Sequence, residues 1–357
     1  MASGGVTGYA ALNARVRVMY STLLSPQTFA SLYEAVDFNA LIGALKNTEY
    51  GPYLDKAKDK DLTARRAAYL IRNRLTDVYQ SIIRTAPEYA RPLLIQRFRY
   101  FEIDNLKAVL RGLIAGASWD RVRFVQFPMG THSVIPAQEM VEAGNIAAAV
   151  ELLRGTPYYE TLSHAMKRFS TEQNIFPLEV ALDLSYWREL WKDINQLPSE
   201  DRTQALRILG TLVDTNNLMW AIRYKEYHHL SEEELINYTL PFGYHVRDED
   251  IRAIAAGADI PQIVKRIYPQ LDNIDTLLQE PRKGLPELEL QLKRQVMRQC
   301  VSAFVGNPFH IGIPLALLQL LEYEILDLTV LLEAKSAEGL NEDFRPFVMM
   351  GQTPKAE

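Results

Sequence analysis

The chain of 357 residues is poor in cysteine and carries little net charge. Its single cysteine, Cys300, excludes an internal disulfide framework and fits a reducing compartment. We expect this thiol to be a buried structural side chain, because no reactive-site motif surrounds it. The net charge of −5 provides no basic field, so the composition does not favour nucleic-acid binding.

Long uncharged apolar runs are missing as well. The most apolar stretch, Ile311 to Ala334, contains four acidic residues, whereas a helix that crosses a membrane needs about 20 nearly uncharged residues. The stretch therefore predicts a long and mostly buried helix. The first residues are small and uncharged and do not resemble a secretory signal.

Motifs that build catalytic and cofactor sites are missing too. We find no Gly-x-x-x-x-Gly-Lys-Ser/Thr loop for phosphates, no Gly-x-Gly-x-x-Gly and no Gly-x-Ser-x-Gly. There is no His-Glu-x-x-His, and the one histidine pair, His228-His229, consists of neighbours that do not face one direction on a helix. The sequence therefore predicts no catalytic residue, no cofactor and no metal site.

What the chain does contain is a repeat. Glu102-Ile103-Asp104-Asn105-Leu106 returns as Asp214-Thr215-Asn216-Asn217-Leu218 and again as Glu324-Ile325-Leu326-Asp327-Leu328. The shared pattern is acid-x-x-Asn/Asp-Leu, and its copies are 112 residues (214 − 102) and 110 residues (324 − 214) apart. A period of this length indicates that each repeat is a whole helical module.

The residues around the motif repeat with it. Leu178–Leu182 matches Leu288–Leu292, 35 residues before the second and third acids (214 − 179 and 324 − 289). Pro128–His132 matches Pro241–His245 after the first and second motifs. Each module is therefore predicted to run from a long helix to a motif helix, a Pro-x-Gly-x-His turn and short helices.

The two ends of the chain interrupt this order. Leu45–Tyr50 matches Leu153–Tyr158, which belongs to the end of a module, although no motif precedes it. The third module has its motif, but the chain stops soon after Met350 without such an end. We predict an all-α fold of three modules with approximate threefold symmetry, closed into a funnel. The predicted parts are an N-terminal segment 1–60 that completes the last module, and modules at 61–170, 171–280 and 281–357.

The first predicted long helix carries a narrow apolar stripe from Ala64 to Ile82. Its apolar residues step by three or four positions, which is typical of a helix packed on other helices. We expect the arginines around this stripe to be solvated, namely Arg65, Arg66, Arg72, Arg74 and Arg84.

The repeated polar residues are the candidates for a functional role. The acid and the Asn/Asp of each motif are three positions apart, so they share one helix face. They either hydrogen-bond between helices and fix the packing register, or line a central opening. Arg111 and Arg223 follow five residues after the motif leucine and could pair with neighbouring carboxylates, whereas Glu333 stands at this place in the third module. The candidate residues are Glu102, Asn105, Arg111, Asp214, Asn217, Arg223, Glu324 and Asp327.

Four stretches carry a resemblance to a known family. They are Leu12–Arg17, Arg99–Leu106, Asn217–Lys225 and Asn307–Pro314. In this order, and with the threefold period, the chain resembles the C subunit of prokaryotic V/A-type ATPases, the relative of the d subunit of eukaryotic vacuolar proton pumps. The likeness covers nearly the whole chain, from Gly8 to Met350.

The resemblance implies a non-catalytic rotor subunit without a cofactor. One copy would sit on the proteolipid rotor ring, at the cytoplasmic face of the membrane, and touch the membrane only through this ring. It would receive the central shaft, formed by subunits of the D and F type, and pass rotation between the catalytic head and the ring during ATP-linked ion transport.

Two other classes of protein stay open at this point. One is a helical-repeat scaffold or adaptor of another complex, but the short repeats of about 34 or 40 residues that favour it are not found. The other is an enzyme with an all-helical active site of unfamiliar type, for which hydrolase activity of the purified protein is the discriminating observation.

Overall fold

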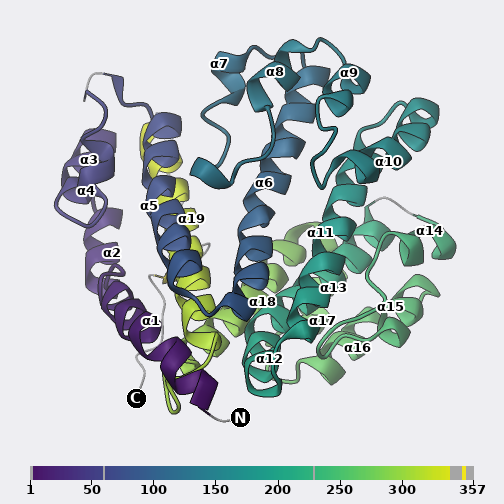
Figure 1. Ribbon diagram of the computed structural model, residues 1–357. Coiled ribbons are helices and arrows are strands. Elements are labelled where there is room, and N and C mark those ends of the chain that lie inside the picture. Colours follow the sequence, from purple (N-terminus) through teal and green to yellow (C-terminus); the bar gives the residue numbers. More distant parts are fainter. Residues whose placement is uncertain (1–2, 59–60, 228–229, 338–347, 351–357) are drawn as a thin grey trace.

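The computed structural model describes residues 3–58, 61–227, 230–337 and 348–350 (Figure 1). Over these residues the regular elements are all helices, so the predicted all-α class is confirmed. His228-His229 and the residues after Met350 lie outside the described part of the chain. The module bounds and the funnel shape stay predictions.

The helices fall into an N-terminal group and three groups that each contain one motif. The N-terminal group is α1 (Ser3–Ser21), α2 (Pro26–Tyr33), α3 (Phe38–Lys46) and α4 (Gly51–Leu54). The group of the first motif is α5 (Ala64–Thr85), η2 (Glu88–Ala90), α6 (Arg91–Ile114), α7 (Trp119–Val122), η3 (Gly130–His132), α8 (Ala137–Glu142), α9 (Ile146–Glu151) and α10 (Tyr159–Glu172).

The second and third groups follow the same order in part. The group of the second motif is α11 (Phe176–Gln196), α12 (Ser199–Ala205), the π-helical turn η4 (Leu206–Gly210), α13 (Thr211–Glu226), α14 (Glu232–Asn237), α15 (Asp248–Ala255), α16 (Ile260–Ile267) and α17 (Ile274–Gln279). The group of the third motif is α18 (Pro281–Ser302) and α19 (Gly312–Ser336).

Local signals in the sequence explain where the long helices begin and end. The Thr63 side chain caps α5 by accepting a hydrogen bond from the backbone N–H of Arg66, and Pro87 follows its end. Pro92 lies in the first turn of α6, which ends two residues before Gly116, whose φ is +61°. The long apolar stretch near the C-terminus forms α19, whose motif acids are buried inside the protein rather than exposed to lipid.

The long helices pair in a closed cycle. The motif helix α6 packs on α11, α13 packs on α18, and α19 packs on α5. Each motif helix therefore packs on the long helix of the next group, and the third group packs on the first. Figure 1 shows two of these pairs, α5 beside α19 and α6 beside α11.

The helix α1 ties this cycle together near the N-terminus. The hydroxyl of Tyr9 donates to the buried carboxylate of Asp201 at 2.9 Å, and the amide of Asn13 donates to the carbonyl of His310 at 3.2 Å. Because Asp201 belongs to α12 and His310 precedes α19, α1 holds parts of the second and third groups at once. Cys300, on α18, is fully buried, as expected.

Candidate functional site

The acid that opens each motif is buried and holds a turn of the chain. Glu102, Asp214 and Glu324 each have 0% relative exposure. Glu102 accepts a hydrogen bond from the backbone N–H of Val134 at 2.6 Å, and Glu324 accepts one from that of Leu24 at 2.6 Å. Buried carboxylates need such donors, since an unpaired buried charge is costly.

Asp214 holds its turn with more backbone donors. Its two oxygens accept the N–H groups of Tyr244 and His245, both at 2.7 Å, and of Val246 at 3.2 Å. These residues belong to the repeated Pro-x-Gly-x-His turn and its continuation. Burial raises the pKa of Asp214 to about 6, although the backbone donors act in the opposite direction.

A tyrosine hydroxyl completes each of these acid sites. Tyr158 donates to Glu102 at 2.6 Å, and Tyr268 donates to Asp214 at 3.4 Å. Tyr50 donates to Glu324 at 2.6 Å. The first two tyrosines follow their acids by 56 and 54 residues, whereas Tyr50 precedes Glu324 by 274. The N-terminal segment thus supplies to α19 the contact that the other motif helices receive from residues after them.

The third acid differs from the others because an arginine binds it. We expected Arg74 to be solvated, and this was wrong: the residue is 6% exposed, with its Nη1 atom 2.7 Å from Glu324 Oε1. Its Nη2 atom donates to the carbonyl of Thr22 at 2.9 Å. Burial raises the pKa of Glu324, and Arg74 opposes this rise. Removing either partner alone would leave a buried charge unpaired.

The side-chain amide of the motif asparagine both donates a hydrogen bond to the backbone of a loop and accepts one from it. Asn105 donates to the carbonyl of Phe127 at 2.8 Å and accepts its N–H at 2.6 Å. Asn217 makes the same pair of hydrogen bonds with Leu240, both at 2.8 Å. Each amide therefore satisfies one buried donor and one buried acceptor of a loop that crosses the motif helix.

The third motif has Asp327 where the other two have an amide. Asp327 Oδ2 accepts the N–H of Met349 at 2.9 Å and the N–H of Met350 at 2.7 Å. A carboxylate suits this place because it only accepts hydrogen bonds, and both groups that meet it are donors. Burial raises the pKa of Asp327 to about 7, against the effect of the two backbone donors.

The two candidate arginines lie at the contacts between groups. Arg111 of α6 is 2.5 Å from Glu179 of α11, and Arg223 of α13 forms an ion pair with Glu289 of α18. These pairs join equivalent positions of two successive helix pairs. At the third contact, between α19 and α5, Glu333 stands at the arginine position.

Six of the eight candidate residues are thus inside the protein. The buried ones are Glu102, Asn105, Asp214, Asn217, Glu324 and Asp327. Only the side chains of Arg111 and Arg223 are open to solvent, with exposed fractions of 63% and 39%. A partner that leaves the fold intact can therefore touch the two arginines, whereas the three motif acids have no exposed surface.

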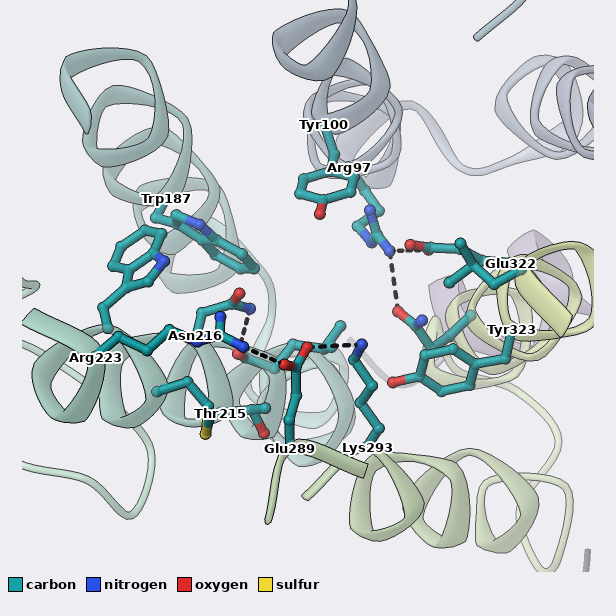
Figure 2. A pocket seen from close by; sticks show the side chains of 15 residues that line it. Arg97, Tyr100, Trp187, Thr215, Asn216, Arg223, Glu289, Lys293, Glu322 and Tyr323 are labelled. Carbon is teal, nitrogen blue, oxygen red and sulfur yellow. Dashed lines mark hydrogen bonds and ion pairs between the residues drawn. The ribbon is translucent and has the colours of Figure 1, made fainter. Parts of the chain in front are cut away.

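The three motif helices meet around a cavity of about 130 Å³ (Figure 2). Arg97 of α6 crosses towards α19, where it pairs with Glu322 and donates to Gln319 at 3.0 Å. From the opposite side Lys293 of α18 reaches Glu289 at 2.8 Å. A second cavity of about 390 Å³ lies next to it, between α5, α6 and α19.

The residues that face these cavities occupy equivalent places on the motif helices. Each motif helix has two partly or fully exposed side chains at fixed positions: one stands two residues after the motif acid, and the other stands six residues after it. We call them the cavity-facing residues: Asp104, Asn216, Leu326, Ala108 and Trp220, which line one or both cavities, and Val330, which is exposed one helical turn beyond Leu326. The repeat pattern does not point to them, because these residues differ between the repeats. This variation at fixed positions is the sequence signal that marks them.

Neither a cluster of metal-binding side chains nor a membrane-spanning helix is found in the described part of the chain. Over those residues no group of three or more His, Cys, Asp or Glu side chains is placed to hold a metal ion. Among the helices that the structure describes, none combines the length and apolar character needed to cross a membrane.

Comparison with known proteins gives one consistent result. Residues 12–344 match the ATP synthase (C/AC39) subunit family. The C subunit of the A-type ATP synthase of Methanocaldococcus jannaschii is 25% identical over 347 residues, covering 96% of this chain and 86% of the relative. That of Archaeoglobus fulgidus is 24% identical over 324 residues, covering 90% and 89%. The chain therefore belongs to the ATP synthase (C/AC39) subunit family, whose members are non-catalytic subunits of rotary ATP synthases.

Proposed function

We propose that this subunit is a socket in the central rotor, which joins the shaft to the proteolipid ring. The shaft, made of subunits of the D and F type, enters the space between the three motif helices. Rotation then passes between the catalytic head and the ring through this chain. One copy serves each complex, at the cytoplasmic face of the membrane, and it contacts the membrane through the ring alone.

The observation that carries the proposal is the line of cavity-facing residues. Most of each motif helix is buried, yet Leu326 and Val330 of α19 remain 47% and 41% exposed. Exposed apolar side chains beside a cavity are typical of a surface that a partner covers. Their counterparts on α6 and α13 face the same two cavities, so a single inserted partner would touch all three helices.

The candidate residues divide between two roles in this proposal. The six buried acids and amides hold each motif helix against its own loop, which gives the three modules the stiffness that torque transfer requires. Arg111 and Arg223 border the funnel interior, where they keep neighbouring modules together and contact the shaft. The modules close into the funnel through the contact of Tyr50 with Glu324.

Binding of the purified shaft subunits to the full chain tests this function. Val330→Glu places a charge on the exposed apolar surface of the motif helix, so we expect the dissociation constant for the shaft to rise more than tenfold. Leu152→Glu is the matched control, because Leu152 is 44% exposed but directly follows the short helix α9 and does not lie on a motif helix. Equal binding by both variants and the unchanged chain would place the shaft elsewhere.

A further inference from the structure

The three faces that surround the proposed socket are built from equivalent sequence positions but differ in chemistry. At the position two residues after the motif acid stand Asp104, Asn216 and Leu326, which are respectively acidic, neutral and apolar. The long helices differ as well. On α11, which packs on α6, Asp183 stands four residues after Glu179 (183 − 179). On α18, which packs on α13, Lys293 stands four residues after Glu289 (293 − 289). The charge at this position is therefore reversed between two modules.

The acidic face is formed by α6 and α11. The amine of Lys107 is 2.7 Å from Asp183 and 3.1 Å from Asp104, so one ammonium serves two carboxylates. The Lys107 side chain is only 13% exposed, whereas that of Asp104 is 47% exposed. Arg111 pairs with Glu179 on the same two helices, so these five side chains together carry one surplus negative charge, which Asp104 presents to a partner in the socket.

The basic face is formed by α13 and α18. Glu289 pairs with Arg223 through one oxygen and with Lys293 at 2.8 Å through the other, so one carboxylate serves two cations. The side chains of Arg223 and Lys293 are 39% and 36% exposed. These three side chains therefore carry one surplus positive charge, and they line the cavity that Figure 2 shows.

The third face, on α19, is apolar. Leu326 and Val330 lie one helical turn apart and are both exposed. The charged residues nearest to them on this helix are Glu322, which is 12% exposed and is neutralised by Arg97, and Glu333, which attracts Arg72 of α5. This face therefore attracts an apolar side chain and penalises a charged one, because a buried charge without a partner is costly.

We propose that these three faces fix the shaft in one of the three orientations that the approximate threefold symmetry would otherwise make equivalent. The shaft end that enters must then carry a basic group, an acidic group and an apolar group at successive positions around its axis. This inference rests on the proposed socket function. The physical reason is that rotating the shaft by one third of a turn would bring like charges together and a charge against the apolar face.

Cross-linking from the shaft tests the orientation. Single cysteines are placed at Ala108, Trp220 or Val330, one per variant, and a single cysteine is placed near the end of the shaft subunit. Cys300 does not interfere, because it is fully buried and burial raises the pKa of its thiol. We expect one of the three variants to cross-link at least tenfold more than the other two.

A neutralised chain provides the contrast. Asp104→Asn and Lys293→Gln leave the two neutral pairs Lys107–Asp183 and Arg223–Glu289, and Leu326→Asn copies the residue of the second module. In this triple variant we expect the three cysteine positions to cross-link within about threefold of one another. Cross-linking that is equal in the original chain, or a preference that survives in the triple variant, would overturn the inference while the socket stands. A shaft that fails to bind and to cross-link anywhere would instead overturn the socket function.

Charge reversal gives a second readout that a purely structural role would not move. Lys293→Glu should raise the dissociation constant for the shaft about tenfold at low ionic strength, and raising the salt concentration should shrink this effect. Lys192→Glu is the control, because Lys192 is 60% exposed and pairs with Glu189 on its own helix. A Lys293→Glu effect that is independent of salt would argue against electrostatic selection.

Discussion

Replacing Asn217 by alanine should destabilise the protein by removing two buried hydrogen bonds at once. The side chain has 0% exposure, and its amide binds both the carbonyl and the N–H of Leu240 at 2.8 Å. In the variant both backbone groups of Leu240 lose their partner inside the protein. Each buried unsatisfied group costs about 1–3 kcal/mol, so the free energy of unfolding should fall by roughly 3 kcal/mol.

Thermal unfolding measures this loss against a matched control. With an unfolding entropy of about 2.1 cal/mol/K per residue, a loss of roughly 3 kcal/mol over a chain of this length lowers Tm by about 4 °C. Asn216→Ala is the control, since the neighbouring amide is only half-buried and donates to Leu212 of its own helix at 2.9 Å. Its effect should stay within about 0.5 kcal/mol. If both variants unfold at the same temperature, the amide does not hold the loop as we describe.

Two further substitutions test the third motif. Tyr50→Phe removes the hydroxyl that donates to buried Glu324 at 2.6 Å, so thermal unfolding should show a loss of about 1–2 kcal/mol. Tyr53→Phe is the control and should show almost no loss, because the Tyr53 hydroxyl binds an exposed carboxylate. Equal losses would mean that the buried N-terminal contact stabilises the protein no more than an exposed one. Asp327→Asn should change the pH dependence of Tm. Burial raises the pKa of Asp327 to about 7 in the folded protein, so the folded protein holds the proton of this carboxyl more tightly than the unfolded chain does. The resulting contribution of Asp327 to the free energy of unfolding is fully present below about pH 4. It is lost as the pH rises towards 7, by up to about 1.4 kcal/mol per pH unit. The asparagine variant should therefore gain on the unchanged chain between pH 5 and 7, and a difference in Tm that does not vary with pH would refute the assignment.

Features repeated in the sequence were predictable, since repetition shows which positions the fold requires. The motif acids, the motif amides and the matching Tyr50 and Tyr158 all stood out, and the structure places them in buried hydrogen bonds. What the sequence did not reveal was their burial. An acid three positions from an amide has the same pattern whether the pair faces a loop of its own module or an open channel.

Two features were missed for identifiable physical reasons. Arg74 looked like a surface residue because its partner, Glu324, is 250 residues away and nothing local predicts the ion pair. The cavity-facing residues were missed because they are not repeated: Asp104, Asn216 and Leu326 share a position but no chemistry. The shared residues of the repeats make buried hydrogen bonds in this chain, and we propose that the differing residues at equivalent exposed positions select the partner.

Single-molecule rotation tests the central claim, that this subunit turns with the rotor, most directly. A cysteine at Val36, which is 88% exposed, allows a reporter rod to be attached while buried Cys300 stays unreactive. With the catalytic head of the whole complex fixed to a surface and ATP added, rods on this chain should rotate at the same rate as rods on the shaft. Rods that stay still on this chain while those on the shaft rotate would contradict the assignment.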